Sequence, residues 1–152
     1  MGMERRTKVA MKRSYFRKQG KSDTAKIKRN IQALLRSFAI ERDGGCVLRN
    51  YPETGACSDI LQAEHLVSRQ HSKYFGDIRN IVCLCQRHHI FWKPTNSRQY
   101  WELIEKIIGK ERWEWVKLAE QDKHPWKPDW KLVELEILQK IKKLDKKLCT
   151  AD

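Results

Sequence analysis

The segment NIVCLCQRHH, residues 80–89, places two cysteines and two adjacent histidines within ten residues of a 152-residue chain that has five of each. Two residues separate Cys85 from His88, a spacing with which one turn directs two side chains at a tetrahedral zinc ion. Two more ligands are needed, and Cys46 and Cys57, which bracket a loop upstream, are the expected suppliers. The sequence thus predicts a structural zinc site that ties this loop to the start of a helix. The alternative is that these cysteines bind no metal.

The identity of the fourth ligand stays open. Ten residues separate Cys46 from Cys57, more than the usual spacing of about two to four. Cys83 competes for the place, but one residue separates it from Cys85 in an expected strand, a poor geometry for chelating one small ion. We therefore expect Cys83 to be a small buried hydrophobe and Cys149 to have no partner. An odd number of cysteines in a non-secreted chain favours thiols or metal ligands over disulfides.

The balance of charged residues indicates a polyanionic partner. Lys and Arg number 32 against 19 Asp and Glu, which gives a net charge of +13 and a pI near 9.7. At this size nucleic acid is the leading candidate for that partner. A membrane would attract the same charge, but no run of about 18 apolar residues is present and the first residues lack the apolar core of a signal peptide. We expect a soluble, cytoplasmic protein that contacts no membrane.

Residues 1–21 are expected to form a flexible basic arm. They hold eight Lys or Arg residues against one Glu and show no apolar period strong enough to fold alone. Tyr15 and Phe16 among these cations suit a segment that follows phosphates, and the alternative is a solvated tail that aids solubility. The rest is expected to be a single domain over residues 22–148, with a tail at residues 149–152.

The apolar pattern predicts an α+β domain that is mostly helical. A helix should begin near Ser22 and end at DGG, residues 43–45. Two short strands are expected in DILQAEHLV and IVCLC, followed by a helix that begins in QRHHIFW and that Pro94 limits. Two more helices are expected in SRQYWELIEKII and KERWEWVKLAE, joined at Gly109. A long C-terminal helix should cover residues 130–148.

This last helix carries one apolar stripe. Its members recur at steps of three or four residues: Trp130, Val133, Ile137, Ile141, Leu144 and Leu148. Such a stripe usually packs on its own domain, and the alternative is a homodimer formed by a pair of these helices. Lysines near its end favour both the helix dipole and DNA contacts. Trp101, Trp113 and Trp115 lie at helical spacings among aliphatic residues, so we expect them in the core and not stacked on bases.

His89 is free for a second role if His88 binds zinc, because successive residues on a helix point about 100° apart. The residues expected to share that role lie upstream: Glu64 and His65 on the first strand, and Asn80 in the following loop. Strand alternation would place Glu64 and His65 on opposite faces of the sheet unless the strand ends there.

In this order and spacing, AEHLV, Asn80 and CQRHH resemble the His-Asn-His (HNH) nucleases. That family has a ββα-metal motif, with the first histidine at a strand end, the asparagine in the loop and the last ligand on the helix. The resemblance covers about residues 42–92 and implies a small zinc-stabilised ββα-metal core embedded in the helical nuclease domain. Further downstream, QYWELIEKIIGKERWEWVKL is similar in layout to the tails of phage recombination nucleases of the NinG type.

The resemblance also implies a role for each residue. His65 would be the general base, Glu64 and His89 would bind a catalytic Mg²⁺ or Mn²⁺, and Asn80 would hold the His65 backbone and the loop in place. The zinc set of Cys46, Cys57, Cys85 and His88 matches the structural zinc of many members. This chain departs from the family at Glu64, where many members have Asp, and at Arg49, where a first CxxC would have its second cysteine.

These residue types suit the hydrolysis of a phosphodiester, which needs a base for water and a positive charge for the leaving oxygen. A histidine with a pKa of about 6.5 is available as a base at neutral pH. We therefore expect a metal-dependent DNA endonuclease. The main alternative is a non-enzymatic zinc-stabilised DNA-binding protein, with phosphate contacts from the basic arm and the Lys-rich last helix. An RNA-directed nuclease or a structural subunit is a lesser alternative.

Overall fold

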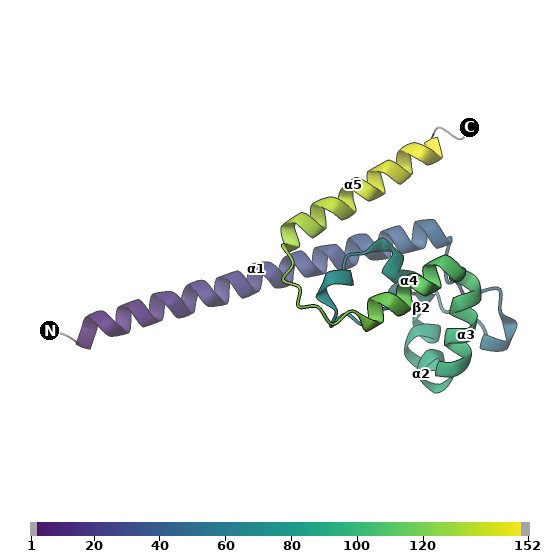
Figure 1. Cartoon of the computed structure of the whole chain (residues 1–152), viewed down its shortest axis with the longest axis horizontal. Helices are drawn as coiled ribbons and strands as arrows, with labels where there is room; N and C mark the ends of the chain where they lie inside the picture. Colours follow the sequence, from purple (N-terminus) through teal and green to yellow (C-terminus); the bar gives the residue numbers. More distant parts are fainter. Residues whose placement is uncertain (1–2, 150–152) are drawn as a thin grey trace.

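The structure is a computed structural model that describes the backbone of residues 3–149 and the side chains of residues 23–143. Its helices are α1 (Met3–Asp43), α2 (Lys93–Thr95), α3 (Ser97–Ile108), α4 (Lys110–Gln121) and α5 (Trp130–Cys149), and its strands are β1 (Leu61–His65) and β2 (Ile81–Cys85) (Figure 1). Short 3₁₀ turns lie at Pro52–Thr54, Ser72–Tyr74 and Ile78–Asn80, and a π-helix covers Arg87–Trp92. The predicted α+β class is confirmed at the level of a mostly helical chain with one small sheet. No helix in the described part is long and apolar enough to cross a membrane.

α1 confirms the predicted end of the first helix. It ends at Asp43, and Gly44 and Gly45 follow with φ angles of 63° and 122°, a region that favours glycine. The helix begins at Met3, so the backbone of residues 3–21 continues it where the sequence predicts a separate arm. No proline interrupts this segment, and adding turns to an existing helix costs far less than nucleating a new one. The side chains of residues 1–22 lie outside the described part, as do residues 150–152 of the expected tail.

The sheet separates two apolar cores. On one side α1 and α5 pack against it, and Figure 1 shows α5 beside the second half of α1. We call this the α1 core, and its buried residues are Ile31, Leu35, Phe38, Ala39, Phe75, Ile81, Cys83 and Ile137. On the other side lie α3 and α4. This α3 core buries Cys46, Leu48, Leu66, Val67, Val82, Leu84, Cys85, Tyr100, Leu103, Ile104, Val116 and Ala119.

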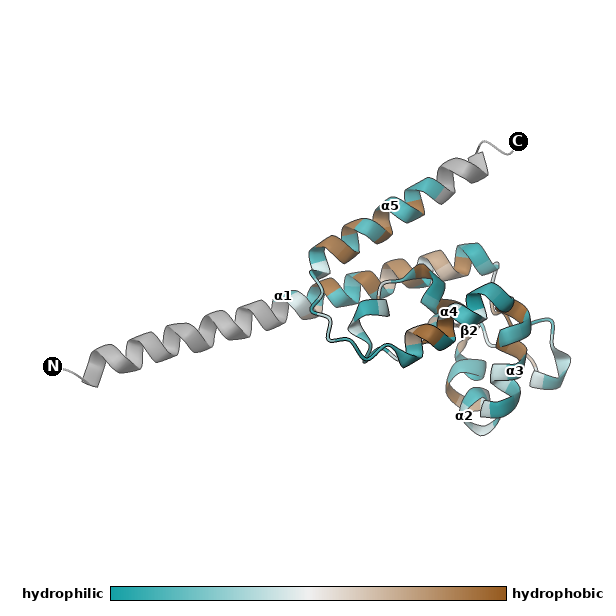
Figure 2. Ribbon diagram, viewed as in Figure 1, coloured by the Kyte–Doolittle hydropathy of each residue, from teal (hydrophilic) through white to brown (hydrophobic). Residues whose placement is uncertain are grey.

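The described part of the apolar stripe of α5 packs on the domain, as predicted, while the side chains of its members Leu144 and Leu148 lie outside the described residues. Ile137 is buried in the α1 core. Other members are partly buried against the same core: Trp130, Val133 and Ile141. Figure 2 shows hydrophobic (brown) and hydrophilic (teal) stretches alternating along the coloured part of α5. The loop before β2 approaches this helix so closely that a Cβ on Gly76 would collide with Cγ1 of Val133.

β1 and β2 confirm the two predicted strands and pair antiparallel, with His65, the last residue of β1, opposite Ile81. All five residues of β2 are buried. The predicted helix after β2 has two parts, the π-helix and α2, and Pro94 lies in the first turn of α2. Pro94 therefore begins the second part instead of ending the first, because a first-turn residue needs no backbone N–H bond.

α3 and α4 confirm the two helices predicted on either side of Gly109. Trp101, Trp113 and Trp115 pack against the α3 core, as expected from their helical spacing. The rings of Trp101 and Trp113 lie 5.9 Å apart, and Trp115 meets the ring of Tyr74 edge-on at 5.7 Å. These indoles thus hold the two helices and the loop between the strands together.

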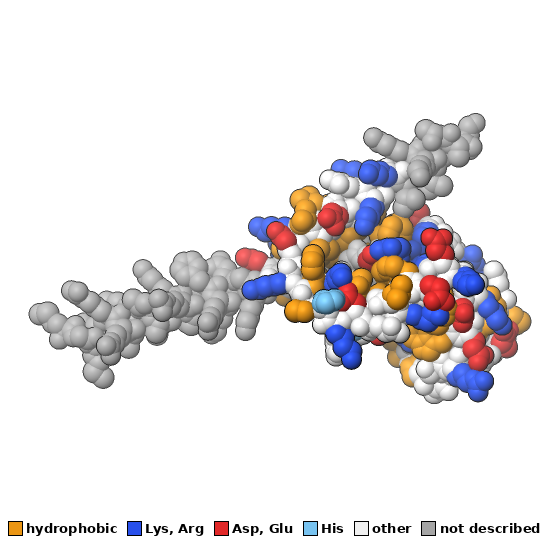
Figure 3. All heavy atoms as spheres, viewed as in Figure 1, with side chains coloured by type: hydrophobic (Ala, Val, Ile, Leu, Met, Phe, Trp, Pro, Cys, Tyr) orange, Lys and Arg blue, Asp and Glu red, His pale blue; other side chains and the backbone are white. Residues whose placement is uncertain are grey.

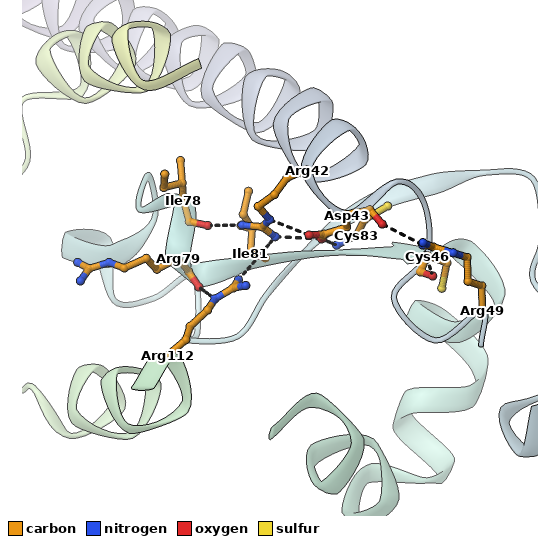
Figure 4. Close-up of polar contacts among 9 residues, drawn as sticks. All are labelled: Arg42, Asp43, Cys46, Arg49, Ile78, Arg79, Ile81, Cys83 and Arg112. Carbon is orange, nitrogen blue, oxygen red and sulfur yellow. Dashed lines mark hydrogen bonds and ion pairs between the residues drawn. The ribbon is translucent and has the colours of Figure 1, made fainter. Parts of the chain in front are cut away.

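Two arginines fix the backbone that leads into β2 (Figure 4). Arg42 of α1 and Arg112 of α4 both donate to the carbonyl oxygen of Ile81. Each also donates to a carbonyl in the turn just before β2, at 2.9 Å for Arg42 and 2.7 Å for Arg112. Burial lowers the pKa of Arg112 to about 10, and the charge of Arg42 contributes. The turn that contains Asn80 is therefore held from α1 and from α4.

Candidate functional site

Three cysteines and one histidine meet where the loop after α1, the end of β2 and the π-helix come together. The donor atoms of Cys46, Cys57, Cys85 and His88 all lie within 4.8 Å of one another. Their sulfurs lie 3.4, 3.7 and 3.1 Å from Nδ1 of His88, in that order. A tetrahedral ion with Zn–S bonds of about 2.3 Å and Zn–N bonds of about 2.0 Å would separate sulfur from nitrogen by about 3.5 Å. The predicted set is brought together and could hold a metal ion such as zinc.

The surroundings of this cluster orient its histidine. His88 is fully buried, and its Nε2–H donates to the carbonyl oxygen of Thr54 at 3.1 Å. This bond leaves Nδ1 for the three sulfurs, as the second hydrogen bond of a metal-binding imidazole commonly does. Cys83 lies in the α1 core, as predicted, and Cys57 supplies the third sulfur.

Two of the three thiols in the cluster, Cys46 and Cys57, resist ionisation, whereas at Cys85 burial is outweighed by hydrogen bonds with His88 and Ser58, which lower the pKa. Burial raises the pKa of Cys46, and burial together with the nearby Cys46 raises the pKa of Cys57 to about 12. Thiolates packed this closely repel unless a cation compensates their charge. A soft divalent cation that replaced the thiol protons would remove the repulsion, and thiolate and imidazole ligands suit such a cation.

Arg87 explains how Cys57 reaches the cluster from so long a loop. Its Nη1 donates to the carbonyls of Thr54 and Ala56 at 2.9 and 2.8 Å, and its backbone N–H donates to Ser58. Gly55 lies under the guanidinium with a φ of 84°, and a Cβ there would collide with both Nη atoms of Arg87. Arg87 was not predicted from the sequence. The glycine after a Pro-x-x turn was a signal for the tight loop, but nothing local marks Arg87 as its partner.

Gly55→Ala is expected to destabilise the protein by about 3 kcal/mol, since it combines a left-handed residue with displacement of Arg87 from two carbonyls. Gly109→Ala is a matched control because Gly109 has a nearly equal φ of 82°, and a Cβ at that position would meet nothing within 4 Å. The control should lose about 1–2 kcal/mol. Urea unfolding of the two variants measures the difference, and equal losses would show that the Arg87 contact contributes nothing.

A second predicted set lines one cavity of about 510 Å³ at the end of β1. Glu64 and His65 come from β1, and His89 comes from the π-helix. The other residues around the cavity are Ala63, Ser68, Arg69, Lys93, Pro94 and Ser97. Glu64 and His65 reach the same cavity although they are adjacent, because the strand ends at His65. The structure thus brings together three residues that lie up to 25 positions apart in the sequence.

Glu64 is the buried anion of this cavity, with a side chain only 7% exposed. One carboxylate oxygen, Oε2, lies 2.6 Å from Nε2 of His89, and the other, Oε1, accepts from the ammonium of Lys93. Burial raises the pKa of Glu64, but the hydrogen bond from His89 and the charge of Lys93 outweigh it, so the pKa is lowered overall. Glu64 is therefore ionised at neutral pH and available to a cation.

His89 is held between two oxygens. Its Nδ1 lies 2.5 Å from Oε1 of Gln62, while its Nε2 faces Glu64. The contact with Glu64 requires a hydrogen on Nε2, whereas an imidazole that donates only Nδ1–H to the amide would present its Nε2 lone pair to a cation shared with Glu64. Two side-chain donors are few, but Mg²⁺ commonly keeps several waters. In the described part of the chain, the Cys/His cluster alone gathers three or more such donors.

His65 presents a defined tautomer. Its Nε2–H donates to the carbonyl oxygen of Phe75 at 3.0 Å, and its ring stacks on Phe75 with centroids 5.3 Å apart. This leaves the Nδ1 lone pair as the basic atom. Burial lowers the pKa of His65, the Phe75 hydrogen bond offsets part of this, and the charge of Arg69 lowers it further. The imidazole is therefore neutral at pH 7.

Asn80 is fully buried and braces the loop that follows His65. Its Oδ1 accepts from the backbone N–H of Val67 at 2.5 Å, and its Nδ2 donates to the carbonyls of Val67 and Tyr74 at 3.2 and 2.9 Å. Its own backbone carbonyl accepts from Leu66 at 2.7 Å. These bonds fall on the loop one residue or more beyond His65, where the resemblance implied a hold on the His65 backbone itself.

Lys93 and Gln62 are the residues of this cavity that the sequence analysis missed. Both had a periodic signal. Lys93 follows His89 by four residues, which places the two on one face of a helix, and Gln62 precedes Glu64 by two residues, which places them on one face of a strand. The spacing predicts a shared face but no chemical role for Lys93 or Gln62, and only the contacts with Glu64 and His89 reveal that role.

Comparison with known proteins identified no relative of this chain. No family model, no curated protein and no solved structure matches the chain. The function is therefore inferred from the chemistry of the Cys/His cluster and of the cavity at the end of β1.

Proposed function

We propose that this protein is a metal-dependent DNA endonuclease of the His-Asn-His type, with His65 as the general base and with Glu64 and His89 as ligands of one divalent cation. One observation carries the proposal: Glu64 and His65 of β1 and His89 of the π-helix line a single cavity, and the imidazole of His65 has its Nε2–H tied to a carbonyl. A metal site that only stabilises the fold does not require Glu64, His65 and His89 to line a cavity next to it.

His65 would take a proton from the attacking water at Nδ1. The Phe75 carbonyl holds the ring in the tautomer that leaves this atom free, and the lowered pKa keeps it unprotonated at neutral pH. Asn80 would keep the loop of Arg69 in register with the base through its bonds to Val67 and Tyr74. Such positioning matters because a general base must lie within hydrogen-bond reach of the proton that it removes.

The charge around the cavity suits a phosphodiester. Arg69 and Lys93 line it with Glu64, so a substrate phosphate would meet two cationic side chains. Mg²⁺ or Mn²⁺ bound to Glu64 and His89 would supply a Lewis acid that neutralises the leaving 3′ oxygen. Hydrolysis of this kind leaves 5′-phosphate and 3′-hydroxyl ends.

The wider surface suits a nucleic acid. The net charge is +13, and Figure 3 shows Lys and Arg side chains distributed over the visible face and interleaved with acidic ones. Such a distribution favours contacts with the phosphate backbone over a wide area. The element order of strand, loop, strand and helix, with zinc at the Cys/His cluster, would form the ββα-metal core of this proposal.

A second candidate is a zinc-stabilised DNA-binding protein without catalytic activity. It is favoured by the ion pairs of Glu64, since Lys93 and His89 already satisfy both carboxylate oxygens. In this case the cavity residues would serve as a buried polar network that fixes the π-helix against β1. DNA would then be bound without a divalent cation and left intact.

Supercoiled plasmid distinguishes the two candidates. The protein, with its Cys/His cluster loaded with zinc, should convert supercoiled DNA to nicked or linear forms when Mg²⁺ or Mn²⁺ is added. The reference condition is the same buffer without added Mg²⁺ or Mn²⁺, because a strong chelator would also strip the cysteines. Tight binding with no cleavage in either metal would contradict the nuclease and favour the binding protein.

A further inference from the structure

Lys93 forms an ion pair with the anion of the cavity. Its ammonium bonds Oε1 of Glu64, and its side chain is 25% exposed. The same ammonium lies 5.0 Å from the ring centre of Tyr100 and 5.7 Å from that of Trp101. The rings of α3 thus flank the ammonium and keep it at the edge of the cavity, where its stem can pivot without leaving.

A divalent cation on Glu64 needs the same carboxylate. A hard cation binds carboxylate oxygens directly, and an ammonium group on one of those oxygens both occupies a lone pair and repels the incoming charge. Glu64 is buried, so a cation shared with His89 and the ammonium of Lys93 would lie against the same carboxylate at close range. Lysine and cation therefore compete for one group.

We propose that Lys93 and the divalent cation exchange on Glu64, and that the displaced ammonium turns to the substrate phosphate that lies in the same cavity. This inference rests on the proposed function, and it adds an order of events. Cation binding would create the phosphate-binding form of Lys93, so the charge of Lys93 would add to that of Arg69 towards substrate only once the metal is in place. Among the residues that line the cavity, Arg69 also carries a fixed positive charge, but Lys93 and not Arg69 pairs with Glu64, so Arg69 would not take part in the exchange.

The exchange predicts effects of opposite sign on metal binding and on cleavage. Lys93→Met keeps the stem and removes the charge, so the variant should bind Mn²⁺ about tenfold more tightly than the wild type. Its cleavage of plasmid at saturating Mn²⁺ should nevertheless be about 100-fold slower, because the phosphate loses one cationic partner. Lys93→Arg, whose planar fork grips a carboxylate with two bonds, should bind Mn²⁺ more weakly than the wild type.

Titration with Mn²⁺ alone, followed by the electron paramagnetic resonance of the free ion, measures these affinities on the zinc-loaded full chain. Arg69→Met is the matched control, because it removes the same charge from the same cavity without freeing Glu64. Its effect on Mn²⁺ affinity should be several-fold smaller than that of Lys93→Met. Equal or weaker Mn²⁺ binding by Lys93→Met, or equal effects of the two neutral variants, would overturn the exchange.

Glu64→Gln separates a failure of this inference from a failure of the proposed function. If the wild type binds Mn²⁺ and Glu64→Gln does not, the site exists and the Lys93 variants decide the exchange. If Mn²⁺ binds to none of the proteins, Lys93→Met included, the cation site itself is absent and both proposals fail together. Thermal unfolding of each variant accompanies the titrations, and Lys93→Arg supplies a folded variant of opposite expected sign if the neutral one is unstable.

Discussion

His65→Ala is expected to slow DNA cleavage by about 100- to 10,000-fold, the contribution typical of a general base. The loss should appear in the rate at saturating DNA and Mg²⁺, with DNA binding retained, because His65 bonds only one carbonyl of the fold. Single-turnover cleavage of a labelled duplex, with binding measured separately by fluorescence anisotropy, gives both quantities. The proposed base thus predicts a large effect on the chemical step and a small one on affinity.

The pH dependence supplies an independent readout of the same residue. The pKa of His65 lies below its ordinary value of 6.5, so the wild type should cleave at a level rate through neutral pH and lose activity as the pH falls below about 6.5. The variant should lose this acidic limb along with its rate. His124→Ala is the control, since His124 is exposed and lines a separate cavity beside Asp122. A His65→Ala protein that is folded and cleaves at the wild-type rate would rule out the assigned base.

Cys85→Ser is expected to have the largest effect on stability. A structural zinc site is worth about 10 kcal/mol or more, which is comparable with the whole stability of a small domain. Cys85 is fully buried and approaches Nδ1 of His88 more closely than the other two sulfurs, at 3.1 Å. Its loss should release the metal and unfold the segment that joins the cluster to β2. Elemental mass spectrometry of the purified protein and a thermal melt measure the two effects.

Cys83→Ala is the matched comparison on the same strand. Cys83 is also fully buried but lies in the α1 core, so alanine should cost only about 1 kcal/mol through the small cavity that it leaves. Its metal content should equal that of the wild type. If Cys85→Ser kept the wild-type melting temperature, the cluster would not be a structural metal site.

Much of the metal cluster could be predicted because chelation follows local spacing. Cys85 and His88 lie within one turn of chain, and Cys46 and Cys57 are the two cysteines that bracket the loop upstream. Cys83 could be set aside by the same reasoning, since strand geometry directs it elsewhere. The strands could be predicted from an apolar period of about 2 residues, and the helices on either side of Gly109 from a period of about 3.6 residues. Burial of one face of each element imposes these periods.

The parts that escaped prediction depend on contacts between distant segments. Arg87 closes the loop of Cys57, and Arg112 holds the turn before β2 across 31 positions of sequence. Nothing in the sequence distinguishes either arginine from the many other basic residues of this chain. The same holds for Lys93, whose partner Glu64 lies 29 positions away. Charge patterns near a site reveal which groups are available, and only the fold decides which of them meet.

Phe75 gives the C-terminal helix a part in the chemistry proposed for the cavity. The carbonyl of Phe75 sets the tautomer of His65, and its ring packs edge-on against Trp130 at the start of α5, 5.4 Å between centroids. The ammonium of Lys28 in α1 lies 4.4 Å from the centre of the same indole and 6.0 Å from the centre of the Phe75 ring. A truncated chain that ends before Trp130 would therefore keep every residue of the cavity and still lose the wall behind its base.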